Sequence, residues 1–264
     1  MKKKETTDLG PNFQLQVHVE RMAKMGAWEY HIHSDEFFWS EGVFFILEMS
    51  PKTNPLTLEK VMTVVHPDDR LSFAKFFEDV IKKKKEIQIK TKFITKSKTI
   101  KYIQSFGQVV FGAKNKPIKV IGIHQDITEQ VETLKKYEDN QVRLNTIVNS
   151  EPECVKIVSA SGKLLEMNPA GLQMIEADSL EKVFENSVYE LIHPEDLKEF
   201  KRIHKCALAG QKEGGRFRII GLKKTVRWME TTSVPLKDKT GKVNSVLSVT
   251  RDITAAVEAE LNLQ

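Results

Sequence analysis

The residues of this chain best suited to chemistry are its histidines and its two cysteines, and their spacing limits what they can do. Cys154 and Cys206 lie far apart and give neither a disulfide framework nor a metal-ligand motif. His31 and His33 share one side of an expected strand, but two ligands do not make a metal site. The other histidines have no acidic or cysteine partner at ligand spacing, and no Ser-His-Asp order, phosphate-binding glycine loop or dinucleotide fingerprint occurs. The sequence therefore predicts neither a metal site nor an enzyme.

The composition is that of a soluble protein with room for ordinary hydrophobic cores. Hydrophobic residues make up 40% of the 264 residues and charged residues 29%. No apolar run approaches the roughly 20 residues that a membrane-spanning helix needs. The basic start, Met1 to Glu5, leads into no apolar segment, which is unlike a secretory signal. We expect a cytoplasmic protein without a membrane segment.

The net charge of +5 is concentrated in the first half of the chain. Lys82 to Lys85 follow an apolar helical stretch, where cations face the negative end of the helix dipole. A basic strand face could suit nucleic acid or an acidic partner, but exposed strands carry lysines routinely to prevent aggregation. We therefore expect no nucleic-acid partner. The lysines of that face are Lys90, Lys92, Lys96, Lys98 and Lys101.

An internal repeat organises the chain. Three blocks recur in the same order at an offset of 126 or 127 residues, which indicates a duplicated domain. The blocks are His66-Pro67-Asp68-Asp69 with His193-Pro194-Glu195-Asp196, Thr99-Ile100-Lys101-Tyr102 with Thr225-Val226-Arg227-Trp228, and Val120 to Thr128 with Val246 to Thr254.

Each copy is expected to contain two short strands, short helices, one longer helix that begins at the His-Pro block, and three closing strands. This order predicts the α+β class, with two domains that each hold an antiparallel sheet of about five strands and helices on one face, joined by a helix. Asn168-Pro169 is a typical helix start. The expected segments are an N-terminal amphipathic segment 1–24, a first domain 25–128, a helical linker 129–149, a second domain 150–254 and an exit helix 255–264.

Both domains end on an Asp that precedes a helix. Asp126 is expected to cap the linker helix, with Glu129 completing a capping box. Asp252 is expected to do the same for the exit helix, with Ala255 in place of the acid. In the linker, spacings of three and four residues favour a short coiled-coil seam. Its members are Leu134, Tyr137, Gln141, Leu144 and Val148.

With these blocks in place, the chain resembles two PAS domains, each with its C-terminal PAC extension. The first copy, with Gly26-Ala27-Trp28-Glu29-Tyr30 and Trp39-Ser40-Glu41, is similar to the PAS subtype of bacterial sensor kinases. The second, with Asn168-Pro169-Ala170 and Arg227-Trp228-Met229-Glu230, fits the general pattern. The resemblance implies a sensory role upstream of a histidine kinase or cyclic-dinucleotide enzyme. No kinase or cyclase motif occurs in these residues.

The resemblance also implies a pocket between each sheet and its helices. The block needed for a flavin-cysteine adduct does not occur, and the ligand position of haem-binding members falls near Glu199 and Phe73, so His204 is expected to be a surface or half-buried residue. The aromatic residues of the first copy could hold a planar cofactor such as flavin, although a filled core is favoured. The second copy is expected to hold a small apolar metabolite or nothing. The pocket candidates are Trp28, Trp39, Phe44, Phe45, Phe73 and Phe77 in the first copy, and Ile157, Met167 and Met174 in the second.

The predicted function is a cytoplasmic sensory, signal-relay and dimerisation module without catalytic activity. Its relay residues would be Asp126, Thr128, Asp252 and Thr254. A homodimer is expected because the last strand of each copy is apolar on both sides, as Val120 on one side and Ile121 on the other illustrate, so something should cover the outer sheet face. The segment from Phe13 to Met22 is one candidate cover and a partner chain is the other. The alternatives are a redox sensor holding flavin or haem non-covalently, and the sensory region of a histidine kinase or diguanylate cyclase.

Overall fold

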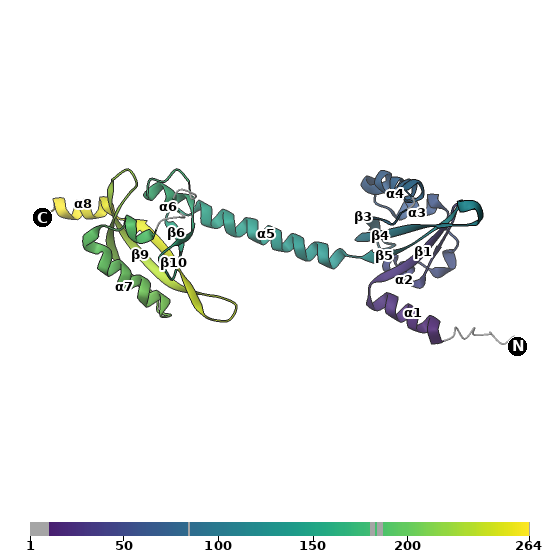
Figure 1. Cartoon of the computed structure of the whole chain (residues 1–264), viewed down its shortest axis with the longest axis horizontal. Coiled ribbons are helices and arrows are strands. Elements are labelled where there is room, and N and C mark those ends of the chain that lie inside the picture. Colours follow the sequence, from purple (N-terminus) through teal and green to yellow (C-terminus); the bar gives the residue numbers. More distant parts are fainter. Residues whose placement is uncertain (1–10, 84, 180–182, 184–186, 264) are drawn as a thin grey trace. The chain divides into compact units, whose positions relative to one another are not determined.

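The chain folds into two compact units whose boundary follows Tyr137, within helix α5 (Thr128–Ser150). The computed structural model describes residues 11–83, 85–179, 183 and 187–263. Each unit is a five-stranded antiparallel sheet with helices, as the sequence predicts (Figure 1). Within the described ranges no helix is both long and apolar enough to cross a membrane.

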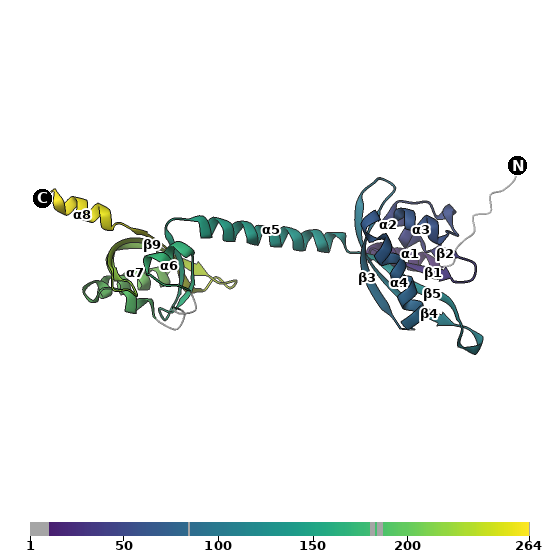
Figure 2. The ribbon, with the colours of Figure 1, turned by 90° about the horizontal axis from the view of Figure 1, so that it is seen from above.

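The first unit has the strand order β2-β1-β5-β4-β3. Helices α2 and α4 pack on the inner face of this sheet (Figure 2). In chain order the elements are α1 (Pro11–Met22), β1 (Met25–His31), β2 (Glu36–Trp39), α2 (Glu41–Leu47), η1 (Pro51–Thr53), α3 (Leu58–Val64), η2 (Pro67–Asp69), α4 (Arg70–Lys83), β3 (Ile87–Ile94), β4 (Ile100–Phe111), η3 (Ala113–Asn115) and β5 (Pro117–Asp126).

The second unit repeats the topology as β7-β6-β10-β9-β8, with α7 packed on its inner face. After α5 the elements are β6 (Cys154–Ser159), β7 (Leu164–Met167), α6 (Pro169–Met174), η4 (Val188–Leu191), η5 (Pro194–Asp196), α7 (Leu197–Leu208), β8 (Glu213–Ile220), β9 (Val226–Lys237), β10 (Val243–Asp252) and α8 (Thr254–Asn262).

Strand register shows which positions of the two units are equivalent. Trp28 lies opposite Trp39 on β2 and opposite Gly122 on β5. In the second unit Lys156 lies opposite Met167 on β7 and Ser248 on β10. Position 28 therefore corresponds to 156, and position 122 to 248. By the same pairing, 124 corresponds to 250 and 105 to 231.

The His-Pro-acid-acid blocks form a 3-10 turn before the long helix rather than its first α-helical turn. Their last acid is used on the neighbouring strand. Asp69 Oδ2 accepts a hydrogen bond from Lys92 N on β3 at 2.6 Å, and Asp196 Oδ2 accepts one from Arg218 N on β8 at 2.7 Å. These blocks thus fasten each long helix to an edge of its sheet.

Helix α1 does not cover the outer sheet face, and the expectation that it might is wrong. It packs against α2 and β1, where buried Glu20 accepts hydrogen bonds from Ser40 Oγ at 2.7 Å and Gly42 N at 3.0 Å. This polar anchor fixes α1 by its charged side, so its apolar side chains remain exposed. They include Phe13, Leu15, Val19 and Met22.

The boundary within α5 leads to a prediction about domain autonomy. None of the residues of α5 is buried, and each unit has its own core. Trypsin should therefore cut near Lys135, Lys136 or Arg143 and leave two fragments of about half the 30.2 kDa chain mass. Both fragments should unfold cooperatively in calorimetry. Rapid loss of one half, or early cuts within β3 and β4, would contradict two independent cores.

Candidate functional site

The second unit contains an internal cavity of about 40 Å³ between its sheet and its helices. That is room for about one to three water molecules. One end is polar, and comprises Cys154 and Lys156 from β6 and Thr250 from β10. The remaining wall is apolar, and is made by Met167, Met174, Ile175, Val188, Leu191, Ile192, Phe200, Phe217, Ile219 and Met229.

Alternation along β6 decides which side chains reach this cavity. Cys154, Lys156 and Val158 are buried on the inner face, whereas Val155 and Ile157 are half-buried on the outer face. Placing Ile157 in the pocket was therefore wrong, because it lies one position out of register with the inner face. Met167 and Met174, the other two candidates of this copy, line the cavity.

Lys156 is the residue that sequence reasoning missed. It is 8% exposed, and its Nζ donates to Thr250 Oγ1 at 2.7 Å, with Cys154 Sγ at 3.9 Å. A lysine on a strand is normally placed outward, since charged side chains are rarely buried without a partner. The repeat did carry a signal, because the equivalent position in the first unit is the buried Trp28.

The same region of the first unit is filled by rings. Trp28 stacks on His124 with ring centroids 5.4 Å apart, and Phe77 meets Trp28 edge-on at 5.5 Å. Phe73 packs against Phe77 at 5.2 Å. His124 Nδ1 bonds Ser105 Oγ at 2.8 Å, and burial lowers the pKa of His124 to about 3, so its ring is neutral at physiological pH. The aromatic candidates of this copy thus pack on one another.

The remaining candidates of the first copy divide between core and surface. Trp39 and Phe44 are buried, with ring centroids 5.5 Å apart. Phe45 is 57% exposed, with the Arg21 guanidinium 5.3 Å from its ring centroid. Assigning Phe45 to the pocket was wrong, because adjacent helix positions point about 100° apart and only one of the two can face the sheet.

His204 does not belong to the cavity lining. It is 5% exposed, and the expectation of a surface or half-buried side chain is therefore corrected. Its Nδ1 lies 2.6 Å from the Tyr189 hydroxyl, and burial lowers its pKa. This histidine is held as part of the packing between α7 and η4.

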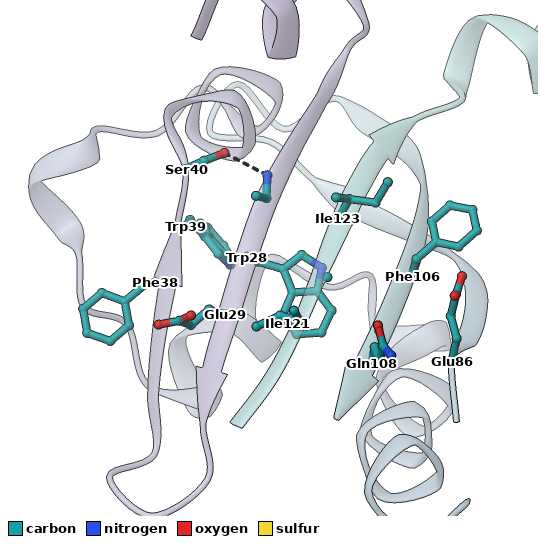
Figure 3. Close-up of a pocket in the computed structure, with 13 residues that line it drawn as sticks. Trp28, Glu29, Phe38, Trp39, Ser40, Glu86, Phe106, Gln108, Ile121 and Ile123 are labelled. Atoms are coloured by element: carbon teal, nitrogen blue, oxygen red, sulfur yellow. Dashed lines mark hydrogen bonds between the residues drawn. The ribbon is translucent and has the colours of Figure 1, made fainter. Parts of the chain in front are cut away.

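The outer face of the first sheet carries a shallow apolar trough of about 720 Å³ (Figure 3). Phe38 on β2, Phe106 on β4, and Ile121 and Ile123 on β5 line it, and Glu29 lies at its side. Phe38 and Ile121 are 37% and 38% exposed. The trough therefore leaves apolar side chains partly open to solvent on the face opposite the helices.

At the end of β10 a polar cluster joins the sheet to α8. Asp252 Oδ1 accepts from Thr254 N at 2.9 Å and from Thr254 Oγ1 at 2.6 Å, while Arg227 on β9 donates to Oδ2 at 2.9 Å. Thr254 Oγ1 also accepts from Trp228 N at 2.9 Å. Burial alone would raise the pKa of Asp252, but the hydrogen bonds from Thr254 and Arg227 outweigh it and hold that pKa below its usual value.

The end of β5 carries the same cluster. Asp126 Oδ1 accepts from Thr128 N at 2.9 Å and Oδ2 from Lys101 Nζ at 2.8 Å, and Thr128 Oγ1 accepts from Tyr102 N at 3.0 Å. We call these two clusters the strand-to-helix junctions. In each, the Asp lies two residues before the helical Thr rather than at the cap position itself.

The capping box expected with Glu129 does not form. Glu129 Oε2 instead accepts from Lys24 Nζ at 2.6 Å, between α1 and β1. The other end of α5 is held by buried Asn168, which caps α6 as predicted by accepting from Gly171 N at 3.0 Å. Its Nδ2 donates to Val148 O at 3.0 Å and Glu153 O at 2.9 Å.

Burial of His124 predicts a pH dependence of stability. Because its pKa falls from 6.5 to about 3 on folding, the unfolded chain binds more protons between these values. Stability of the first unit should therefore be full above about pH 6.5 and fall by up to about 1.4 kcal/mol per pH unit below it.

Denaturant unfolding at several pH values, followed by tryptophan fluorescence, measures this slope. In His124→Asn, where the amide retains a partner for Ser105, the slope should be shallower than in the unchanged chain. Parallel stability curves for the two proteins would contradict the assignment.

Two matches to the PAS fold cover most of the chain, one over residues 36–124 and one over residues 143–253. Neither matched region is a catalytic domain. A stretch of 150 residues is 23% identical to the probable diguanylate cyclase DgcE of Escherichia coli, strain K12. That stretch is 57% of this chain but only 13% of the relative.

Two solved structures are among those similar to this chain. A sensory box histidine kinase/response regulator from Burkholderia thailandensis is 20% identical, with 51% of this chain and 98% of that one covered and a TM-score of 0.42. An RNA-binding light-oxygen-voltage receptor is 11% identical, with coverages of 90% and 98% and a TM-score of 0.40. With two matched regions, two sheets of the same strand order and the same junction at the end of each, this chain belongs to the PAS family and consists of two PAS domains in tandem.

Proposed function

We propose that this chain is a cytoplasmic sensory and signal-relay module in which the second PAS domain senses and the helices α5 and α8 carry the response. One observation supports this most directly. Thr250, at the polar end of the cavity, and Asp252, at the strand-to-helix junction, lie two residues apart on the inner side of β10. In this proposal, a displacement of Thr250 is transmitted to Asp252 along about 7 Å of strand.

The chemistry of the junction suits a relay. A strand that ends and a helix that begins both leave backbone groups without regular partners. Asp252 and Thr254 satisfy these groups jointly with Trp228 on β9. A small displacement of β10 must therefore either move α8 or break hydrogen bonds, which makes helix position responsive to the sheet.

The first domain has a different role in this proposal. Its interior is packed with the rings of Trp28, Phe73, Phe77 and His124, so we assign it to transmission and assembly rather than to ligand binding. A flavin or haem would require these rings to be displaced. A visible absorption spectrum of the purified protein tests that alternative, because a bound flavin or haem is coloured.

We further propose that two copies of the chain pair through the trough on the outer face of the first sheet. The chain's own candidate cover, α1, is anchored elsewhere by Glu20, and the trough leaves Phe38 and Ile121 open. Two-fold pairing is the commonest closed arrangement for identical chains. Exposed Leu134 and Tyr137 of α5 would extend the contact.

The output is proposed to be a catalytic domain or partner of the kind named for the relatives, a diguanylate cyclase or a histidine kinase. The resemblance to DgcE is confined to a region of sensory type here, so the enzyme that receives the signal would lie outside these two domains. The identity of that enzyme would determine which reaction the module regulates in the cell.

The relay proposal predicts a selective effect of Asp252→Ala. Loss of the junction carboxylate should cost about 1 kcal/mol, so amides of Thr254–Asn262 should exchange hydrogen about fivefold faster, while strand amides of β9 remain protected. Hydrogen–deuterium exchange read by NMR or mass spectrometry measures this. Asp238→Ala is a matched control, because Asp238 makes the same hydrogen bonds to Thr240 in a turn without a helix. Equal effects of both substitutions on α8, or none, would rule out the junction as a relay.

The dimer proposal predicts that Ile121→Lys yields monomers. Sedimentation equilibrium of the unchanged chain should give twice 30.2 kDa, and the variant should give the chain mass. Ile100→Lys serves as the control, since Ile100 is 43% exposed on the same sheet but outside the trough. A monomeric unchanged chain, or a dimer that tolerates Ile121→Lys, would refute the proposed contact.

A further inference from the structure

The cavity of the second domain is lined at its polar end by a cationic side chain, that of Lys156. Among the described residues, no carboxylate oxygen lies within 4.0 Å of Lys156 Nζ. Taking an ammonium group out of water is costly unless it is paired and hydrogen-bonded. The ammonium has three donors, and in the part of the chain that the structure describes its partners are one hydroxyl oxygen and one sulfur at the limit of contact. Its hydrogen-bonding capacity is therefore not used up by the protein.

The hydroxyl groups around Lys156 are oriented by their own hydrogen bonds. Thr231 Oγ1 donates to Val249 O at 3.2 Å, so it accepts from the Thr250 hydroxyl, which lies 2.8 Å away. Thr250 Oγ1 in turn accepts from Lys156. This chain of donors fixes the Lys156 ammonium at the polar end of the cavity.

The first domain provides an internal comparison at the same three positions. There Trp28 takes the place of Lys156, His124 that of Thr250, and Ser105 that of Thr231. The two rings stack and fill the space. A Cβ on Gly122 would overlap the Trp28 indole, whereas the equivalent Ser248 beside Lys156 carries a side chain bonded to Ser233 at 2.8 Å. One copy of the fold is thus closed by rings, and the other keeps an open space with a cation at its end.

The shape and walls of that space limit what can occupy it. Beyond the ammonium, the cavity is lined by thioether, aliphatic and phenyl groups. One ammonium group matches a single negative charge, whereas a phosphate dianion calls for several donors. The methionine side chains Met167, Met174 and Met229 are unbranched and can adjust to a short tail.

We propose that the cavity of the second domain binds a short-chain aliphatic monocarboxylate, with its carboxylate on Lys156 and its alkyl tail between the methionines. The inference rests on the proposed sensory function, because it names the class of ligand that the sensing domain takes. The cavity of about 40 Å³ is smaller than these acids, so the acid would be accommodated by movement of the flexible Met167, Met174 and Met229 side chains.

Methionine methyl NMR on the full chain tests this at the site itself. Three of the methionines line the cavity, while Met25, Met49 and Met62 of the first domain report on nonspecific effects. Titration with formate, acetate, propionate and butyrate, at ionic strength held with sodium chloride, should shift the Met167, Met174 and Met229 signals in a saturable way. Affinity should rise about fourfold per methylene until the acid outgrows the cavity.

Two comparisons test whether binding depends on the charge of Lys156 and on the charge of the ligand. Lys156→Met should weaken propionate binding by about tenfold or more, whereas Lys163→Met, the same change at an exposed position of the β6–β7 turn, should leave it unchanged. Propionamide, which is uncharged and of similar shape, should bind at least about tenfold more weakly than propionate. Retained methyl dispersion in Lys156→Met shows that the variant is folded.

The outcomes separate this inference from the proposed function. Equal binding of propionate and propionamide, or binding that survives Lys156→Met, would overturn the proposal that Lys156 recognises a carboxylate. The cavity would remain a ligand site. Absence of any saturable shift at the cavity methionines would overturn the inference outright. The junction relay would still stand or fall on the hydrogen exchange of α8.

Discussion

The arrangement of each domain depends on one carboxylate at the point where the central strand ends and a helix begins. Backbone donors at a helix start have no partners within the helix. Asp126 and Asp252 satisfy them through the following Thr, and each pairs with a cation from the adjacent strand, Lys101 or Arg227. The two partners hold the carboxylate ionised despite its partial burial. The exit helix is consequently an extension of the sheet, and its start is set by the sheet's last two strands.

On this shared frame the two interiors have diverged. Trp28 and His124 stack across the inner face of the first sheet, and Gly122 makes the space for the indole. Lys156 and Thr250 occupy the same positions in the second and leave a cavity. In the proposed function, the first domain with its aromatic core serves structure and assembly, and the second domain, whose Lys156 has no carboxylate partner among the described residues, serves recognition. The polar end of the cavity and the junction share β10, which gives recognition a short route to the helix.

The sequence predicted the fold because the repeat supplied every element twice, and the Asp-x-Thr ending identified the junctions. It predicted the pocket less well. Along Cys154 to Val158 both faces of the strand are largely apolar, so hydrophobicity alone does not assign the inner face, and the charge of Lys156 gives no sign that its side chain is buried. Phe44 and Phe45 are adjacent and equally apolar, yet only Phe44 faces the core. Glu129 fits a capping-box pattern in the sequence, but its carboxylate instead accepts a hydrogen bond from Lys24, which is distant in sequence. In each case the deciding contact is tertiary.

In the proposed function, occupancy of the second domain's cavity is coupled to the helix that leaves it, α8. The most direct measurement is amide hydrogen exchange of Thr254–Asn262 with and without saturating propionate, in the unchanged chain and in Asp252→Ala. If the cavity and α8 are coupled, propionate changes the hydrogen exchange of these amides in the unchanged chain, and the change is lost in Asp252→Ala. Binding seen at the cavity methionines with no change in α8, or with the same change in both proteins, would contradict it.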